Sequence, residues 1–430
     1  MALPRSQLNR LMEPEAFLWA TGIEDTFITA PWPQSGRSLD EYELTDHYAR
    51  WSEDLELMAE LGVKAARYGI PWQRVNPEPG SWDWTWADRA LERLLELGID
   101  PIIDLVHYGT PDWLEGAFLN PDFPERVGEY AGRLAERFKG RIHWYTPLNE
   151  PRIAAWYCGK LGWWPPYRRG WRGFVEVMLG ICRGIVRIGQ VLRSVDSEIV
   201  LAHVDASDLY STREATLVTE TERRQQIVFL ALDLVSGQVT ERHSLWQWLL
   251  QSGAREAGLN WFRERAVDLD LVGVNLYPMY TVKELVRSAS GARIRMPYGS
   301  PEMVERIVEL YWERYRRPVM ITETAARGSV VRRRQWLEDS VAAVRKLRAR
   351  AIPLVGYTWW PMFALVAWAY RQGTRPMRDY LIQMGLWDLD ANPDGQLQRR
   401  RTPLVDYYRE IVAGGSQAVG PLARVAPARR

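Results

Sequence analysis

The chain has 430 residues, with 55 Lys and Arg against 54 Asp and Glu, so its formal net charge is +1. This balance argues against a nucleic-acid-binding protein or an anionic-membrane protein, because both need clustered positive charge. The two cysteines, Cys158 and Cys182, form neither a disulfide framework nor a CxxC pair. The sequence begins without an apolar leader and lacks a stretch of about 18 apolar residues. We therefore expect a cytoplasmic protein with no membrane or nucleic-acid partner.

Short apolar runs alternate along the chain with segments of helical periodicity. An amphipathic helix is predicted for 48–61, with Trp51, Leu55, Met58 and Leu61 on one stripe. Strands are predicted for 16–22, 62–70, 99–107, 142–149, 198–204, 269–276, 318–323 and 352–359. Further helices are predicted for 86–97, 125–138, 174–195, 221–235, 301–315 and 336–349. Several strands are apolar at consecutive positions, which is typical of strands covered on both faces.

Eight strand–helix alternations over about 400 residues favour an α/β fold of one (β/α)8 TIM barrel with long βα loops. A doubly wound open sheet is the alternative, but GxGxxG and GxxxxGK[ST] phosphate motifs are both absent. The barrel would form one catalytic domain over 1–412. Residues 413–430 are rich in small residues, Pro and Arg, and the composition predicts a disordered tail.

Two glutamates stand where predicted strands end, which is where barrels of this type carry their active sites. Glu150 ends the fourth strand within TPLNEP, and Glu323 ends the seventh within PVMITET. Strands four and seven lie roughly across the barrel mouth, so the two carboxylates could face each other over a bound molecule. A pair about 5–5.5 Å apart is what retaining glycoside hydrolysis requires. Either glutamate alone would more often be a helix cap or a member of a surface ion pair.

Several motifs in order resemble family 1 of the glycoside hydrolases, the β-glucosidase family. TPLNEP is similar to the acid/base motif of that family and PVMITET to its nucleophile motif. The resemblance extends over about 17–412 and includes RYGIPWQR at 67–74, HYGTPDWL at 107–114, GVNLY at 273–277, GYTWW at 356–360, MGLWD at 384–388 and DYY at 406–408. It implies a β-glycosidase that acts on small-molecule glycosides and uses neither a metal nor an organic cofactor.

By position, the resemblance makes Glu150 the general acid/base and Glu323 the nucleophile. It implies that Arg67 and Tyr277 flank the nucleophile, that Asn149 binds the sugar 2-hydroxyl and that His107 donates to a ring hydroxyl. Trp360 would be a platform for the sugar, and Trp113 and Trp368 would also stand around it. An arginine would keep a nucleophile ionised, whereas a general acid needs a raised pKa.

The chain departs from the family pattern at the two usual sugar anchors. Ala367 stands where the family has a glutamate that binds the sugar 4- and 6-hydroxyls, and the strand-one glutamine has no clear match. Glu24 is the nearest polar residue for that duty. Because hydrogen-bonding groups in a site discriminate strongly between substrates, these departures predict a changed sugar preference.

The chain holds 22 tryptophans against 9 phenylalanines, and some fall near the expected cleft. Trp156, Tyr157, Trp163 and Trp164 follow the acid/base motif and either line a site for an apolar aglycone or pack as a loop core. The five histidines show no metal-binding spacing, although His203 and Asp205 form one ligand-like pair. The arginines at 332–334 either bind an anionic substrate or form solvated surface.

Two other functions remain open from the sequence. A transglycosidase would use the same site to transfer the sugar to an alcohol held by the aromatic loop. A non-catalytic carbohydrate-binding protein on a degenerate barrel would explain the altered anchors, but it need not keep both carboxylates. Neither the sugar nor the aglycone nor the oligomeric state follows from the sequence.

Overall fold

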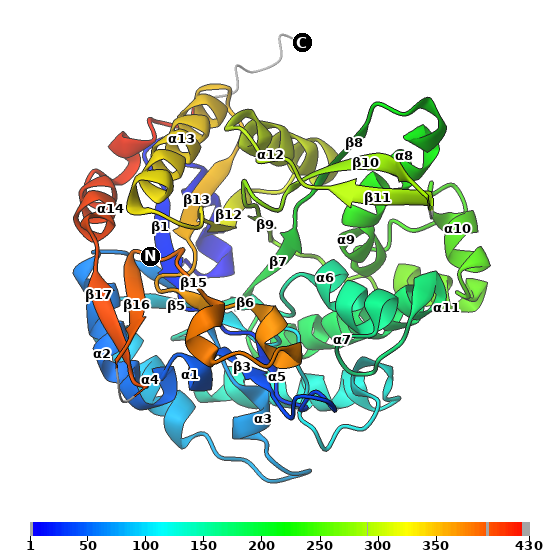
Figure 1. Cartoon of the computed structure of the whole chain (residues 1–430), viewed down its shortest axis with the longest axis horizontal. Helices are drawn as coiled ribbons and strands as arrows, with labels where there is room; N and C mark the ends of the chain where they lie inside the picture. The colour runs from blue at the N-terminus through cyan, green and yellow to red at the C-terminus, as the bar shows by residue number, and fades with distance from the viewer. Residues whose placement is uncertain (1–2, 290, 393–394, 424–430) are drawn as a thin grey trace.

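The computed structural model describes residues 3–289, 291–392 and 395–423, and its centre is a closed barrel of eight parallel strands (Figure 1). Each of the eight predicted strands contributes one strand to this barrel, so the predicted (β/α)8 TIM barrel is confirmed. In chain order the strands are β1 (Leu18–Gly22), β4 (Ala65–Gly69), β5 (Asp100–Asp104), β6 (Trp144–Thr146), β7 (Val200–Ala206), β9 (Leu271–Asn275), β12 (Val319–Thr324) and β13 (Leu354–Trp359). The barrel closes because β13 pairs with β1 in parallel.

Helices surround the barrel in the order that the sequence predicts. The main ones are α2 (His47–Glu60), α4 (Thr85–Glu96), α5 (Phe123–Arg137), α7 (Gly170–Val195), α12 (Glu302–Tyr315), α13 (Val330–Ala349) and α14 (Pro403–Ala413). The segment predicted as one helix over 221–235 is two, α8 (Val218–Val228) and α9 (Leu230–Val235), separated at Phe229. Shorter helices are α1 (Glu41–Leu44), α3 (Trp72–Val75), α6 (Pro151–Ala155), α10 (Trp246–Gln251) and α11 (Glu256–Glu264). None of the helices among the described residues is long and apolar enough to cross a membrane.

The lower half of the barrel interior is filled by apolar side chains. Trp144, Ile102 and Met320 belong to this layer, and alternate residues of the other strands complete it. The segment before β1 closes the bottom, since the 3-10 helix at Arg5–Met12 buries Leu11 and the Trp144 indole donates to the Leu3 carbonyl at 2.7 Å. Only the upper half of the barrel therefore remains for polar chemistry.

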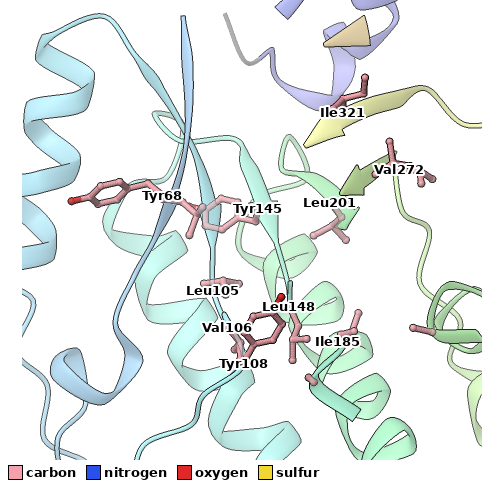
Figure 2. Close-up of a cluster of buried hydrophobic side chains, with 14 of the residues drawn as sticks. Tyr68, Leu105, Val106, Tyr108, Tyr145, Leu148, Ile185, Leu201, Val272 and Ile321 are labelled. Carbon is pink, nitrogen blue, oxygen red and sulfur yellow. The ribbon is translucent and has the colours of Figure 1, made fainter. Parts of the chain in front are cut away.

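The outward-facing residues of the strands form a second apolar layer beneath the helices. Figure 2 shows part of it, with Tyr145, Leu201 and Ile321 from three strands. Ile185 of α7 packs in the same cluster. Because neighbouring residues of a strand point to opposite faces, Tyr145 faces the helices while Trp144 faces the interior. Burial on both faces explains why the strands read as continuous apolar runs.

Long loops follow the carboxyl ends of the strands and carry small sheets. β8 (Leu209–Thr212), β10 (Val282–Ser288) and β11 (Gly291–Arg295) form one three-stranded sheet, at the upper right of Figure 1. The other pairs are β2 (Phe27–Ile28) with β3 (Leu39–Asp40), β14 (Leu365–Val366) with β15 (Leu381–Ile382), and β16 (Trp387–Ala391) with β17 (Leu397–Arg401).

The structure corrects the prediction of disorder for the first part of the tail. After α14 a 3-10 helix covers Gly415–Ala418, and both Val419 and Leu422 are buried. The Arg348 guanidinium donates to the Gly420 carbonyl at 2.9 Å, which holds this segment against the barrel. Composition alone could not show that two apolar residues would find a site on the barrel surface. Residues 424–430 of the predicted tail lie outside the described residues.

Candidate active site

A cavity of about 380 Å³ lies at the carboxyl ends of the barrel strands, and Glu150 and Glu323 both line it. Its floor also includes His107, Asn275 and Tyr277. One wall comes from the loops after β7 and β9 and carries Ser207, Asp208 and Lys283. Another wall comes from the segment after β13 and carries Leu365, Ala367, Trp368, Ile382 and Met384. The two carboxyl groups that the sequence singled out therefore meet in one cavity of the size that small ligands occupy.

A β-bulge turns Glu323 into the barrel. The register of β12 shifts between Ile321 and Glu323 against β9, so that Glu323 pairs with Asn275. Thr322 also faces inward, because its hydroxyl donates to Asn275 Oδ1 at 2.7 Å. Two consecutive residues cannot face the same side of a regular strand, and a bulge removes that restriction.

Two donors hold the Glu323 carboxyl group. Arg67 on β4 places Nη1 2.5 Å from Oε1, and the Tyr277 hydroxyl donates to Oε2 at 2.7 Å. The other guanidinium nitrogen of Arg67 binds Asp104 and also donates to Asn149 Oδ1 at 3.0 Å. Since Arg67 is fully buried, its charge acts on these two carboxylates with little screening by water.

The backbone at Glu150 has an uncommon conformation. Its φ is 46° in the left-handed region, although it is not glycine, and it lies between the short strand β6 and Pro151, the first residue of α6. The amide of Glu150 donates to the Val204 carbonyl at 3.0 Å, and the amide of Asn149 donates to Val106 at 2.9 Å. Bonds to both neighbouring strands thus hold a conformation that costs of the order of 1–3 kcal/mol and is typical of functional sites.

The Glu150 carboxyl group also has two donors. Asn275 Nδ2 lies 2.9 Å from Oε1, and the Tyr108 hydroxyl donates to Oε2. Tyr108 contacts the rings of Trp164 and Trp368, each at 5.3 Å between centroids. These aromatic side chains exclude water from one side of Glu150.

Burial raises the pKa of both carboxyl groups. The donors Tyr108 and Asn275 partly oppose this shift at Glu150. At Glu323 the Arg67 guanidinium opposes the shift, whereas the negative charge of Glu150 adds to it. The pair shares one cavity, so its protons leave in two steps that belong to both groups together. At neutral pH the cavity can therefore hold one protonated and one ionised carboxyl group.

Asn149 and His107 belong to a buried network around these carboxyl groups. Asn149 Oδ1 accepts from Arg67 and Asn275, so its Nδ2 is the donor to His107 Nε2 at 2.9 Å. His107 Nδ1 in turn lies 2.5 Å from Asp25 Oδ1. This arrangement orients the imidazole with Nε2 as an acceptor and Nδ1 directed at a carboxylate.

The predicted substrate-binding residues divide into three groups. His107, Tyr277, Glu24 and Trp368 line the cavity, whereas Arg67 and Asn149 lie directly behind it and contact the lining residues. Trp113 is elsewhere: its indole donates to the Asn76 carbonyl at 2.8 Å and its ring meets Trp72. The structure therefore does not bring Trp113 to the cavity.

Trp360 lies beneath the site instead of forming an open platform. It is completely buried, its ring stacks on His107 at 6.1 Å, and the Arg67 guanidinium lies 4.7 Å from its centroid. Gly22 permits this packing, since a Cβ there would lie 2.2 Å from the Trp360 ring. The motif placed Trp360 at the right strand end but could not show that its faces would be covered.

The two altered anchors have different surroundings. Ala367 lines the cavity among apolar side chains, and none of the described lining residues next to it in the chain carries a carboxylate. Glu24 is 7% exposed and accepts bonds from Thr26 at 2.6 Å and Trp360 at 3.2 Å. Glu24 is thus a positioned acceptor on the cavity surface, while the wall at Ala367 offers only apolar contact.

The aromatic segment after Glu150 lies partly at the cavity and partly in a packed loop core. Tyr157 lines the cavity and stacks on the buried Trp164 at 4.5 Å. Trp163 is 41% exposed, and Trp156 packs against Trp171 and Phe174 away from the cavity.

The contacts support neither an anion site at the arginines 332–334 nor a metal centre. Arg333 is buried and pairs with Asp388 at 2.6 Å, while Arg334 pairs with Glu338 on the surface. Ligand atoms of Asp25, Asp104 and His107 lie within 4.8 Å of one another, but the Arg67 guanidinium already binds Asp104. A cation placed there would meet a buried positive charge.

Sequence reasoning missed the groups that contact the presumed acid. Tyr108 and Asn275 both lay inside quoted motifs, but nothing in those motifs indicated that they would bind Glu150. Asp208 and Lys283 come from the loops after two different strands and gave no sequence signal. Asp25 and Asp104, which lie beside His107 in the structure, were not singled out from the sequence.

The chain is similar to known proteins along most of its length. The family model described as glycosyl hydrolase family 1 matches residues 20–228. The chain is 26% identical to Beta-glucosidase A of Thermotoga maritima over 358 residues, covering 75% of this chain and 79% of the relative. It is 23% identical to Beta-glucosidase 47 of Arabidopsis thaliana over 431 residues, covering 85% and 75%.

The fold also matches solved structures. A family 1 β-glucosidase from Thermotoga maritima superposes with a TM-score of 0.80 at 22% identity, covering 95% of this chain and 99% of that one. The same barrel in complex with glucoimidazole superposes equally well, with a TM-score of 0.80 at 23% identity.

Proposed function

We propose that the chain hydrolyses β-glycosides with retention of the anomeric configuration, through a covalent glycosyl-enzyme. The chain is a divergent member of family 1 of the glycosyl hydrolases, and it is therefore an O-glycosyl hydrolase. The observation that carries this proposal is the meeting of Glu150 and Glu323 in one cavity, each with its own pair of donors. Two carboxyl groups in different environments can divide the acid and nucleophile roles between them.

Glu323 is the proposed nucleophile. Arg67 and Tyr277 bind one oxygen each, so the carboxylate is held in one orientation. Arg67 stays charged throughout and favours the ionised form, while the phenol donates without adding charge. Attack on the anomeric carbon forms the glycosyl ester, and the bond to the leaving-group oxygen breaks.

Glu150 is the proposed acid and base. It gives its proton to the leaving-group oxygen in the first step and takes a proton from water in the second, when water cleaves the ester. Burial, which raises its pKa, favours the protonated resting form. Asn275 bonds to Glu150 and pairs in register with Glu323, so it keeps the two side chains at a fixed relative position.

The cavity walls indicate what kind of sugar is accepted. Glu24 supplies a hydroxyl acceptor at one end, whereas Ala367 and its apolar neighbours supply none. A sugar whose binding depends on hydrogen bonds to its hydroxymethyl group gains little binding energy from this wall. We therefore propose that the enzyme discriminates weakly between a hexoside and the corresponding pentoside.

The test is a panel of p-nitrophenyl β-glycosides, including the glucoside, galactoside, fucoside, mannoside, xyloside, glucuronide and 6-phosphoglucoside. Initial rates identify the accepted sugar, and proton NMR of the first product shows whether the β-anomer appears first. Release of the α-anomer would contradict retention, and no hydrolysis across the panel would contradict the proposed function.

A further inference from the structure

One wall of the cavity carries a cluster of charged groups. Asp208, which follows β7, accepts from Arg152 at 2.6 Å and lies 3.1 Å from the Lys283 ammonium on β10. Arg152 is buried, and its guanidinium also donates to the Ala206 carbonyl at 2.9 Å. Two cations therefore share the Asp208 carboxylate, and the carboxylates of Asp205 and Glu150 also act on Arg152.

Lys283 is the member of this cluster that faces the cavity. Lys283 and Asp208 both line it, whereas Arg152 lies behind Asp208. The Lys283 side chain is 14% exposed, so it keeps access to the cavity but is largely shielded from bulk water. An ammonium group has three donors, and Asp208 takes one direction. Its neighbour Glu284 pairs instead with Arg295 and Arg213, so it does not neutralise Lys283.

The charged wall lies on the side of the presumed acid. Arg152 is in the same short helix that begins after Glu150, and Asp208 holds that helix to the end of β7. A general acid stands next to the leaving-group oxygen. The groups around this end of the cavity therefore meet the leaving group and not the sugar that forms the ester.

The rim beside Lys283 is apolar. Tyr280 is 38% exposed and Met296 is 53% exposed, and both line the cavity mouth. An aromatic ring can pack on such side chains while a substituent on that ring reaches the ammonium group. The wall thus combines an apolar surface with an ammonium group whose carboxylate partner is shared with Arg152.

We propose that the leaving-group subsite of this glycosidase recognises an aromatic aglycone that carries a carboxylate, with Lys283 as the residue that binds it. This rests on the proposed function, because it assigns the leaving-group side from the role of Glu150. A carboxylate is complementary to the Lys283 ammonium, and a charge-assisted bond to Lys283 leaves the Arg152–Asp208 pair intact.

The test compares 3- and 4-carboxyphenyl β-glycosides with the corresponding carbamoylphenyl β-glycosides, using the sugar that the nitrophenyl panel selects. The measured quantity is the ratio of kcat/KM for carboxylate over amide in the wild type, Lys283→Met and Lys283→Arg. Leaving-group reactivity cancels when the ratios of two proteins are compared. Lys139→Met is the control, since Lys139 is exposed and lies before β6, at the opposite end of the barrel.

We expect the ratio for at least one isomer to fall about tenfold in Lys283→Met, to stay near the wild-type value in Lys139→Met, and to be largely kept in Lys283→Arg. Raising the ionic strength should also lower the ratio in the wild type. If Lys283→Met lowers kcat/KM equally for the carboxyphenyl and the carbamoylphenyl glycosides, the proposal is overturned.

A failure of the proposed function is recognised separately. If the wild type hydrolyses no glycoside of the panel, binding of the 4-carboxyphenyl and 4-carbamoylphenyl β-glucosides is measured by calorimetry. A Kd for the carboxylate that rises about tenfold in Lys283→Met, with no such rise for the amide, supports the carboxylate site without catalysis. Identical Kd values in the wild type and Lys283→Met overturn it.

Discussion

The side-chain amide of Asn275 donates to Glu150 Oε1 at 2.9 Å, while the backbone of Asn275 pairs in register with the strand residue Glu323. One residue on β9 thus connects the carboxyl groups of two other strands. Thr322 accounts for the orientation of this amide, because its hydroxyl donates to Asn275 Oδ1. The relative placement of the two glutamates is therefore fixed by hydrogen bonds in the barrel and not by loop conformation.

Glu323→Ala should abolish turnover, by roughly four orders of magnitude or more, because alanine has no carboxylate with which to form the ester. Azide should restore activity by attacking the sugar directly, and NMR should identify the product as the α-glycosyl azide. Glu15→Ala, at an exposed position before the barrel, is the control. Wild-type activity of Glu323→Ala on every aryl β-glycoside would refute the nucleophile assignment.

Glu150→Ala should slow hydrolysis by about 10²–10⁴-fold for poor leaving groups, since these need protonation as the bond breaks. For substrates with activated leaving groups such as dinitrophenolate, the rate of the first step should fall much less. The measurement is kcat/KM for a series of aryl glycosides plotted against leaving-group pKa. An unchanged slope in the variant would argue against the acid role of Glu150.

Tyr108→Phe should move the alkaline limb of the kcat/KM profile to higher pH. The phenol donates to Glu150 and stabilises its ionised form, so removing this donor raises the pKa of Glu150 further. Because the acid must be protonated, activity should persist to a pH roughly one unit higher. Tyr157→Phe, which removes a cavity hydroxyl but neither donor to Glu150, is the control. A shift of the limb to lower pH would contradict the assignment.

Ala367→Gln should raise the preference for hexosides over pentosides. The new amide would give the apolar wall a hydrogen-bonding group, and such groups discriminate between substrates that carry or lack a hydroxyl. The measurement is the ratio of kcat/KM for the accepted p-nitrophenyl hexoside and the xyloside. Ala367→Leu fills the same space without a polar group and should not raise the ratio. If both variants raise it equally, the filled volume and not the hydrogen bond is responsible.

Asp54→Asn should destabilise the fold by about 3–5 kcal/mol at pH 7, because it leaves the buried Arg399 without its carboxylate. Burial acts to raise the pKa of Asp54, but Arg399 and His47 outweigh it and leave the pKa below the usual value. A carboxyl group whose pKa is lowered in the folded protein stabilises the fold at pH values above its pKa in the unfolded chain, which is about 3.9. This stabilisation is lost as the pH falls below that value. Urea unfolding should show that the difference in the free energy of unfolding between the variant and the wild type becomes smaller below about pH 4.

The control for Asp54→Asn is Asp88→Asn, which breaks the exposed pair between Asp88 and Arg137. Exposed ion pairs contribute about 1 kcal/mol or less, so this variant should unfold close to the wild type. A similarly small effect of Asp54→Asn would show that the buried pair contributes no more than a surface pair.

The sequence by itself determined the order of the barrel elements and the two carboxyl groups of the site. Strands covered on both faces read as apolar runs, and the polar residues that end them must gather at one rim. Motifs around Glu150 and Glu323 then indicated the family. These features depend on residues that are close together in the chain, so they can be predicted without a structure.

Only the tertiary structure decided which side chains reach the cavity. The bulge at Glu323, the burial of Trp360 and the displacement of Trp113 depend on register and packing between strands that are distant in sequence. The ordered segment at Gly415–Ala418 depends likewise on a surface built by other elements. Asp208 is shared by Arg152 and Lys283 because residues 152, 208 and 283 meet across three different loops. Long-range contacts of this kind leave no pattern in a single sequence.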